Sequence, residues 1–160
     1  MVADILAAAR AVAAPGVTLK ELDAAAREIL AKAGATSPFL NYHPKFAPIP
    51  YPAVICTSVN DAALHDIPGR YRLKDGDLLS VDCGATLDGW AADAAVSVQV
   101  GHQRPADTRL TATATKAATG ARSTAERATR AHVVRTAGPV SRSPFARFLA
   151  FMTTLPSMSF

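Results

Sequence analysis

The chain has 160 residues, of which 49% are hydrophobic, and a formal net charge of +4 at pH 7. This length fits one folded domain with a buried core. No run of 18 apolar residues occurs, which excludes a membrane-spanning helix, and the first residues lack the basic start of a secretory signal. We therefore expect a cytoplasmic protein with reduced thiols and no membrane partner.

Two helices are predicted at the beginning of the chain. Residues 2–14 are rich in alanine, carry larger apolar residues at helical spacing, and are followed by a Pro-Gly pair. Thr18 and Glu21 have the spacing of a capping box, in which each side chain accepts a hydrogen bond from the other residue's backbone N–H. They predict a second helix that runs to about Lys32, with Gly34 just beyond its end.

The middle of the chain predicts loops around one short strand. Residues 35–52 contain five prolines and are typical of a loop. Residues 53–59 form an apolar run that favours a strand. Residues 60–70 lack periodicity, and Lys74–Asp77 has the composition of a turn.

Residues 77–101 predict a β-hairpin. Asp88-Gly89 separates two apolar arms, and this pair favours a two-residue turn in which both residues have positive φ. With that turn, Gly84 lies opposite Asp93, so Asp82 and Asp93 become diagonal neighbours on one face. Their backbones are then roughly 7–8 Å apart.

Two aspartates on the same face of an apolar hairpin, Asp82 and Asp93, predict a metal site. We expect this hairpin to be largely buried, where an unpaired charge is costly, and a divalent ion between Asp82 and Asp93 would offset their repulsion. Hard oxygen ligands suit Mn, Mg, Co or Fe(II). His65 is open to three interpretations: a ligand, a proton donor or a surface residue. Cys56 and Cys83 belong to no CxxC pair and are expected to be packed thiols.

The composition changes after Gly101. Residues 1–101 hold eight Lys/Arg and eleven Asp/Glu, whereas residues 102–160 hold nine Lys/Arg and two Asp/Glu. The second part is rich in Arg, Ala, Thr and Ser, and residues 122–135 contain no aromatic residue, which argues against nucleic-acid binding. We therefore divide the chain into a folded domain over residues 1–115 and a disordered or weakly helical tail over residues 116–160.

Five stretches of the chain have the order and spacing of motifs in one known family. The stretches are Asn41–His43, Val54–Asn60, His65–Pro68, Leu73–Asp82 and Leu87–Asp93. Over about residues 1–115 the chain thus resembles the type I methionine aminopeptidases. This resemblance implies an α+β fold, the N-terminal half of a pita-bread fold, with an antiparallel sheet and two N-terminal helices.

The resemblance also implies a role for each matching residue. Asp82 and Asp93 match the family's first two metal ligands, and His65 matches the histidine that contacts the substrate and helps stabilise the transition state. Tyr42 and Cys56 match positions that line the pocket for the methionine side chain. The implied cofactors are divalent ions (Co, Mn, Fe(II) or Zn), two per complete site, which activate water. The implied substrate is a peptide, the N-terminus of a nascent polypeptide near the ribosome.

The resemblance fades near residues 112–120, and the family's remaining ligands lack counterparts. Those ligands are one histidine and two glutamates, whereas Glu126 is the only glutamate after Gly101 and stands in no matching context. We therefore expect a truncated chain with weak activity or none. The composition beyond is typical of a GC-rich coding sequence read in the wrong frame, and retranslation of the DNA for residues 110–160 tests this hypothesis.

Two alternatives stay open at this point. One is a non-enzymatic module of the same fold that binds a peptide or RNA. The other is a relative that is specific for proline-containing peptides.

Overall fold

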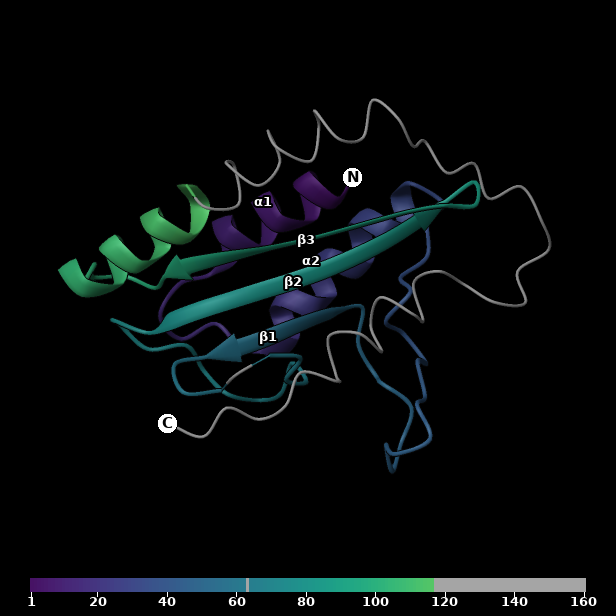
Figure 1. Cartoon of the computed structure of the whole chain (residues 1–160), viewed down its shortest axis with the longest axis horizontal. Helices are drawn as coiled ribbons and strands as arrows, with labels where there is room; N and C mark the ends of the chain where they lie inside the picture. The colour runs from purple at the N-terminus through teal and green to yellow at the C-terminus, as the bar shows by residue number, and fades with distance from the viewer. Residues whose placement is uncertain (63, 117–160) are drawn as a thin grey trace. The chain divides into compact units, whose positions relative to one another are not determined.

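The computed structural model describes residues 1–62 and 64–116, and all of them belong to one compact unit, Met1–Ala118. Two helices precede three strands, and Figure 1 shows their arrangement. The elements are α1 (Val2–Val12), α2 (Leu19–Lys32), β1 (Ile55–Val59), β2 (Leu78–Leu87) and β3 (Trp90–Gln99). The chain is also helical from residue 105 to residue 116. The predicted α+β class, with two N-terminal helices and an antiparallel sheet, is confirmed.

Helix α2 begins and ends as the sequence predicts. The Thr18 hydroxyl accepts from the Glu21 N–H at 3.3 Å, and a Glu21 carboxylate oxygen accepts from the Thr18 N–H at 2.7 Å, which completes the capping box. At the other end, Gly34 has a φ of +64° and Ala35 N–H donates to the Leu30 carbonyl. This left-handed glycine terminates the helix in a Schellman motif.

The three strands form one antiparallel sheet in the order β1-β2-β3. Asp88 and Gly89 have φ values of +51° and +80°, as the predicted turn requires. The predicted register is also confirmed, since Gly84 lies opposite Asp93 and Leu87 opposite Trp90.

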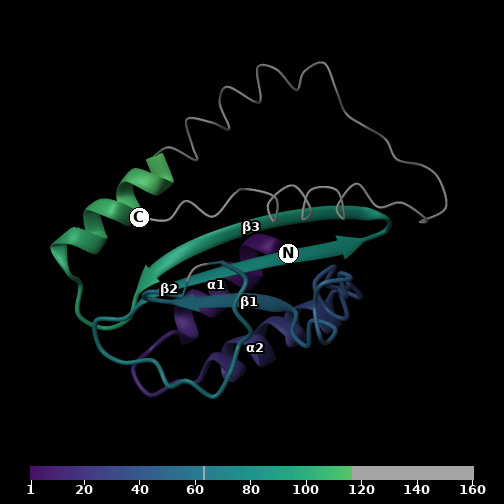
Figure 2. The ribbon, with the colours of Figure 1, turned by 60° about the horizontal axis from the view of Figure 1, so that its bottom comes forward.

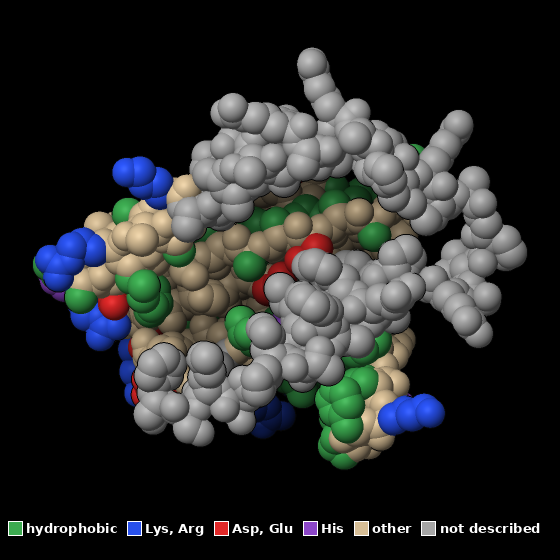
Figure 3. Space-filling view, viewed as in Figure 1, with side chains coloured by type: hydrophobic (Ala, Val, Ile, Leu, Met, Phe, Trp, Pro, Cys, Tyr) green, Lys and Arg blue, Asp and Glu red, His purple; other side chains and the backbone are tan. Residues whose placement is uncertain are grey.

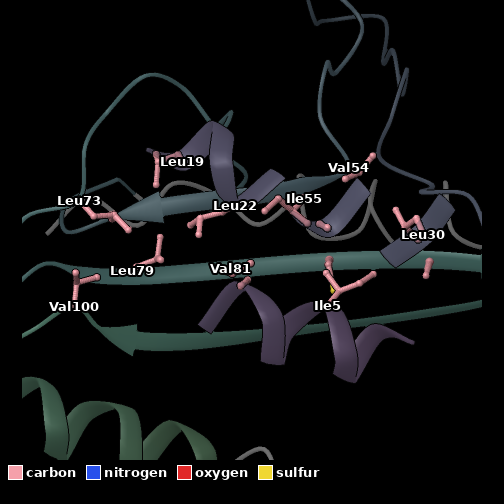
Figure 4. Packing of buried hydrophobic residues seen from close by; sticks show 14 residues of the cluster. Ile5, Leu19, Leu22, Leu30, Val54, Ile55, Leu73, Leu79, Val81 and Val100 are labelled. Atoms are coloured by element: carbon pink, nitrogen blue, oxygen red, sulfur yellow. The ribbon is translucent and has the colours of Figure 1, made fainter. Parts of the chain in front are cut away.

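Both helices lie on one face of the sheet (Figures 1 and 2). Ile5 of α1 and Leu22 of α2 are fully buried against Leu79 and Val81 of β2 (Figure 4). These strand residues alternate with residues that point to the opposite face, because successive side chains of a strand point to opposite sides. The core therefore covers one face of the sheet. The opposite face, which carries Ser80, Asp82 and Gly84 of β2, is the open face.

The expectation of a largely buried hairpin is wrong. Along β2, residues on the helix-facing side are buried, but β3 is exposed or half-buried throughout. Leu87 and Trp90, at the tip, are 38% and 59% exposed. The helices α1 and α2 cover only one side of the sheet, so apolar residues at this tip do not enter the core.

The predicted tail lies almost entirely outside the described residues. Of residues 116–160, the structure describes only residue 116, which is helical. Within residues 1–62 and 64–116, no helix combines the length and the apolar character needed to span a membrane.

We expect Thr18→Ala to lower the free energy of unfolding by about 1 kcal/mol, because the N-terminal amides of α2 lose their hydroxyl acceptor. Urea unfolding followed by circular dichroism measures this change. Thr18→Ser is the matched control, since it keeps the hydroxyl. Equal stability of the alanine and serine variants would contradict this account of the cap.

Candidate metal centre

The hairpin turn brings two carboxylates together on the open face. Asp82 lies on β2 opposite Ala95 of β3, and Asp93 lies opposite Gly84, two residues along β2 from Asp82. Residues two apart on one strand share a face, so Asp82 and Asp93 are diagonal neighbours there. Figure 3 shows acidic side chains near the middle of this face.

Gly84 leaves room for the second carboxylate. A Cβ atom added at Gly84 would lie 3.3 Å from Asp93 Oδ2 and 2.8 Å from the Pro38 side chain. The Asp93 carboxylate therefore leans over Gly84 toward β2. A residue without a side chain is needed where Asp93 and the Pro38 loop approach the strand together.

The site disfavours the ionised form of both carboxyl groups. Burial raises the pKa of Asp82 to about 6, and the negative charge of Asp93 adds to the rise. Partial desolvation also raises the pKa of Asp93, whereas the positive form of His65 lowers it. A divalent cation between Asp82 and Asp93 would favour the ionised form of both.

His65 reaches the same site from the loop that follows β1. Its Nδ1 lies 3.8 Å from Asp82 Oδ2. The loop is held by Tyr51, whose hydroxyl donates toward the carbonyl oxygens of Ile55 and Asp66, each 3.0 Å away. The backbone φ of His65 is +60°, a left-handed value that few non-glycine residues adopt. The loop therefore fixes the imidazole beside Asp82 by contacts distant in sequence.

Cys56 completes the group from β1. It pairs with Asp82 across β1 and β2, and one ligand atom each from Cys56, His65 and Asp82 lie within 4.8 Å of one another. Both cysteines are buried and free, which confirms the prediction of packed thiols. Burial raises the pKa of Cys56 to about 12, although a hydrogen bond with Tyr51 acts in the opposite direction. At neutral pH this thiol is therefore protonated unless a metal displaces its proton.

A cavity of about 480 Å³ opens beside these side chains. Cys56, His65 and Asp82 line it together with apolar residues, among them Leu64 and Val96. The helix over residues 105–116 contributes to the same wall. The cavity therefore combines an apolar lining with three groups that can bind a metal or a polar substrate atom.

The structure does not bring every predicted residue to this cavity. Tyr42 is half-buried in the loop before β1, where its carbonyl accepts from the Tyr51 N–H, and it does not line the cavity. Tyr51, by contrast, was missed by the sequence reasoning. A tyrosine between prolines gives no local signal, since its partners Ile55, Cys56 and Asp66 are recognised only in three dimensions.

The donor set fits a divalent metal. Asp82 Oδ1 is buried and has no hydrogen-bond partner within the described part of the chain. A buried carboxylate oxygen without a partner is costly, and ligation by a cation would satisfy it. The Asp93 carboxylate leans toward the same strand, so two hard oxygen donors are available on the open face.

Comparison with known proteins assigns the family. Residues 1–138 match the model for metallopeptidase family M24. The chain belongs to this family. Membership implies a divalent metal centre, and it confirms the predicted class of metal-dependent peptide hydrolases.

Two curated relatives of this M24 chain are methionine aminopeptidases. Methionine aminopeptidase 1 of Mycobacterium tuberculosis is 47% identical over 111 residues, which cover 69% of this chain and 40% of the relative. The Aquifex aeolicus enzyme is 40% identical over 97 residues, which cover 60% of this chain and 38% of the relative. The chain thus spans about two fifths of the length of these relatives.

Solved structures confirm the predicted pita-bread fold. Methionine aminopeptidase from Thermotoga maritima is 32% identical, with a TM-score of 0.63 over 69% of this chain and 42% of that one. The Rickettsia prowazekii enzyme is 30% identical, with the same TM-score and the same coverage of both chains. A prolidase from Pyrococcus horikoshii, 18% identical with a TM-score of 0.53 over 66% of this chain and 27% of that one, shares the fold alone.

We expect Asp82→Asn to stabilise the metal-free protein at neutral pH. The pKa of Asp82 is raised in the fold from about 3.9 in an unfolded chain, so the fold binds the proton more tightly and loses stability as the pH rises from about 4 to about 6. The variant should be more stable than the wild type by about 1–3 kcal/mol at neutral pH, and equal to it below about pH 4.

Chemical unfolding in the presence of a chelator, repeated across this pH range, measures the difference. Asp88→Asn, in the exposed turn, is the matched control and should leave the pH dependence unchanged. A wild-type protein that gains stability between about pH 4 and 6, relative to Asp82→Asn, would contradict the raised pKa.

Proposed function

We propose that Asp82 and Asp93 bind divalent metal in a site that removes the N-terminal methionine from peptides. The observation that carries this proposal is the register of the hairpin, which places both carboxylates on the open face. Support for the substrate comes from the methionine aminopeptidase relatives, which are 47% and 40% identical to this chain over the matched regions.

Each residue has a defined task in the proposed site. The carboxylates of Asp82 and Asp93 hold the ion, and the positive charge of the ion neutralises the repulsion between them. When bound, the metal lowers the pKa of a coordinated water and polarises the scissile carbonyl. His65 faces the cavity beside Asp82, and its unpartnered Nε2 can bond to a substrate backbone atom.

The cavity is the proposed pocket for the methionine side chain. Cys56 lines it with apolar neighbours, and its volume of about 480 Å³ exceeds what one side chain needs. A buried, protonated thiol behaves there as a small apolar group. Tyr42 does not line the cavity, so its role in this pocket stays a prediction.

The described part of the chain supplies only part of a two-metal site. A complete site of the kind implied by the resemblance needs further ligands and a general base. Within residues 1–62 and 64–116 the glutamates are Glu21 and Glu28, and both belong to α2, on the other side of the sheet. We therefore propose that two ions (Co, Mn, Fe(II) or Zn) bind only in a completed site, and that this 160-residue chain has weak activity or none.

The proposed substrate is the N-terminus of a nascent polypeptide. The proposed setting is the cytoplasm near the ribosome, since initiator methionine is exposed there as synthesis proceeds.

We expect little or no release of methionine when the purified chain is assayed on a Met-Ala peptide with Mn²⁺ or Co²⁺, because Asp82 and Asp93 alone hold metal weakly. Chromatography of free methionine measures the rate. Robust turnover that Asp93→Ala abolishes would contradict the proposed weak activity, although it would support the proposed substrate.

A chimera tests the substrate and the ligands directly. Residues 1–116 of this chain are joined to the part of the M. tuberculosis enzyme that follows its matched region. We expect the chimera to release methionine, and Asp82→Asn or Asp93→Asn to lower the rate about 100-fold or more, because each removes a metal ligand.

The control in the chimera is Asp88→Asn, which removes an acid from the same hairpin but keeps a residue suited to the turn. It should retain the rate of the unmodified chimera. Cleavage of Xaa-Pro peptides in preference to Met-Ala peptides would reject the proposed substrate in favour of a proline-specific activity.

A further inference from the structure

We propose that Cys56, His65 and Asp82 form a separate mononuclear site for zinc or a similar thiophilic cation, on the side of Asp82 away from Asp93. This site does not require the proposed peptidase activity. It shares one carboxylate with the proposed two-aspartate centre and uses neither Asp93 nor any residue beyond the described part of the chain.

Three different segments converge to make the site. Cys56 of β1 and Asp82 of β2 are directly paired across the two strands, and both side chains point to the open face. His65 comes from the loop after β1, which the Tyr51 hydroxyl and the Thr57 N–H hold through the Asp66 carbonyl. Two ligands thus come from one rigid strand pair, one from each strand, and the third comes from an anchored loop.

The distances require only small movements to reach tetrahedral coordination. Ligand atoms bound to one tetrahedral zinc are separated by roughly 3.3–3.8 Å, given metal–ligand bonds of about 2.0–2.3 Å. The His65 Nδ1 to Asp82 Oδ2 distance is 3.8 Å, and all three ligand atoms lie within 4.8 Å. Side-chain rotations close a gap of this size without any change in the β1–β2 register.

His65 and Asp82 face each other without a hydrogen bond. His65 Nδ1 and Asp82 Oδ2 are 3.8 Å apart, which exceeds hydrogen-bond length. The second nitrogen and oxygen of these groups, His65 Nε2 and Asp82 Oδ1, are buried and have no hydrogen-bond partner among residues 1–62 and 64–116. A cation between Nδ1 and Oδ2 would join two groups that the protein brings together but does not pair.

The donor types give this site a metal preference that differs from that of the two-aspartate centre. Thiolate and imidazole together favour Zn²⁺ or Co²⁺, whereas a pair of carboxylates accepts Mn²⁺ and Mg²⁺. Because the cavity adjoins all three residues, the fourth coordination position faces an open space that water or a ligand can enter. Binding converts the Cys56 thiol to a thiolate and releases its proton to solvent.

The two sites are mutually exclusive at Asp82. A zinc ion held by Cys56, His65 and Asp82 would also occupy the imidazole that faces the cavity. Zinc bound on this side therefore competes for Asp82 with metal bound between Asp82 and Asp93. It also competes for His65 with the substrate of the proposed peptidase.

Cobalt absorption tests the site on the 160-residue chain. A Co²⁺–thiolate bond gives an ultraviolet charge-transfer band, which carboxylate or imidazole ligands alone do not give. The sequence holds two cysteines, so Cys83→Ser is the matched control for Cys56→Ser. Cys83 is fully buried on the helix-facing side of the same strand pair. We expect the band in the wild type and in Cys83→Ser, and its loss in Cys56→Ser.

Titrations separate this site from the two-aspartate centre. Asp93→Asn should leave the Co²⁺ affinity read from the thiolate band within about twofold, whereas His65→Ala and Asp82→Asn should weaken it at least tenfold. Circular dichroism checks that each variant is folded, and the His65 and Asp82 variants decide the result if Cys56→Ser does not fold. A wild type without the band, a band that survives Cys56→Ser, or one lost in Asp93→Asn would overturn the proposal. Calorimetry with Mn²⁺ on Asp93→Asn reports on the two-aspartate centre independently.

Discussion

The register of the β2–β3 hairpin is the constraint on which the site depends. A two-residue turn at Asp88 and Gly89, with both φ values positive, fixes every pair along twenty residues of strand. A shift of one residue would send Asp82 and Asp93 to opposite sides of the sheet, because side chains alternate between faces. The same register puts Leu79 and Val81 into the core, so folding and site assembly share one cause.

The site also works against the stability of the fold. Two carboxylates are held together where desolvation raises the pKa of both, and an unpartnered oxygen of Asp82 is buried. Such arrangements persist at functional sites when the surrounding structure determines them, as the paired strands do here. Metal binding would turn this opposition into an attraction, so the energetic cost in the metal-free chain is itself an argument for a cation.

Local patterns were readable from the sequence, and long-range contacts were not. The capping box at Thr18 and Glu21 and the turn at Asp88 and Gly89 were predicted because their partners lie within four residues. The motif resemblance indicates a role for His65, but the position of His65 beside Asp82 depends on Tyr51, for which the sequence gives no local signal. Which face of the hairpin is buried could not be read either, because apolar residues occupy both faces of its strands.

A buried acid on α2 illustrates the same limit. Asp23 follows the apolar Leu22, and a charged residue on a helix is expected to face solvent, yet Asp23 is only 8% exposed. Its carboxylate accepts from the N–H groups of Val54 and Ile55 and from Arg27, and so ties α2 to the start of β1. Val54 and Ile55 lie 31 and 32 residues from Asp23 in sequence, so this contact has no local signal. The contact helps to place Cys56, the next residue of β1, beside Asp82.

The hairpin builds one side of a metal centre, and His65 from a loop and Cys56 from β1 converge on it. We infer that the paired carboxylates bind a cation. Anomalous diffraction from crystals of the 160-residue chain grown with Mn²⁺ tests this inference most directly. We expect an anomalous peak between the carboxylates of Asp82 and Asp93. A map with manganese bound elsewhere, or with ordered carboxylates and no peak between them, would contradict it.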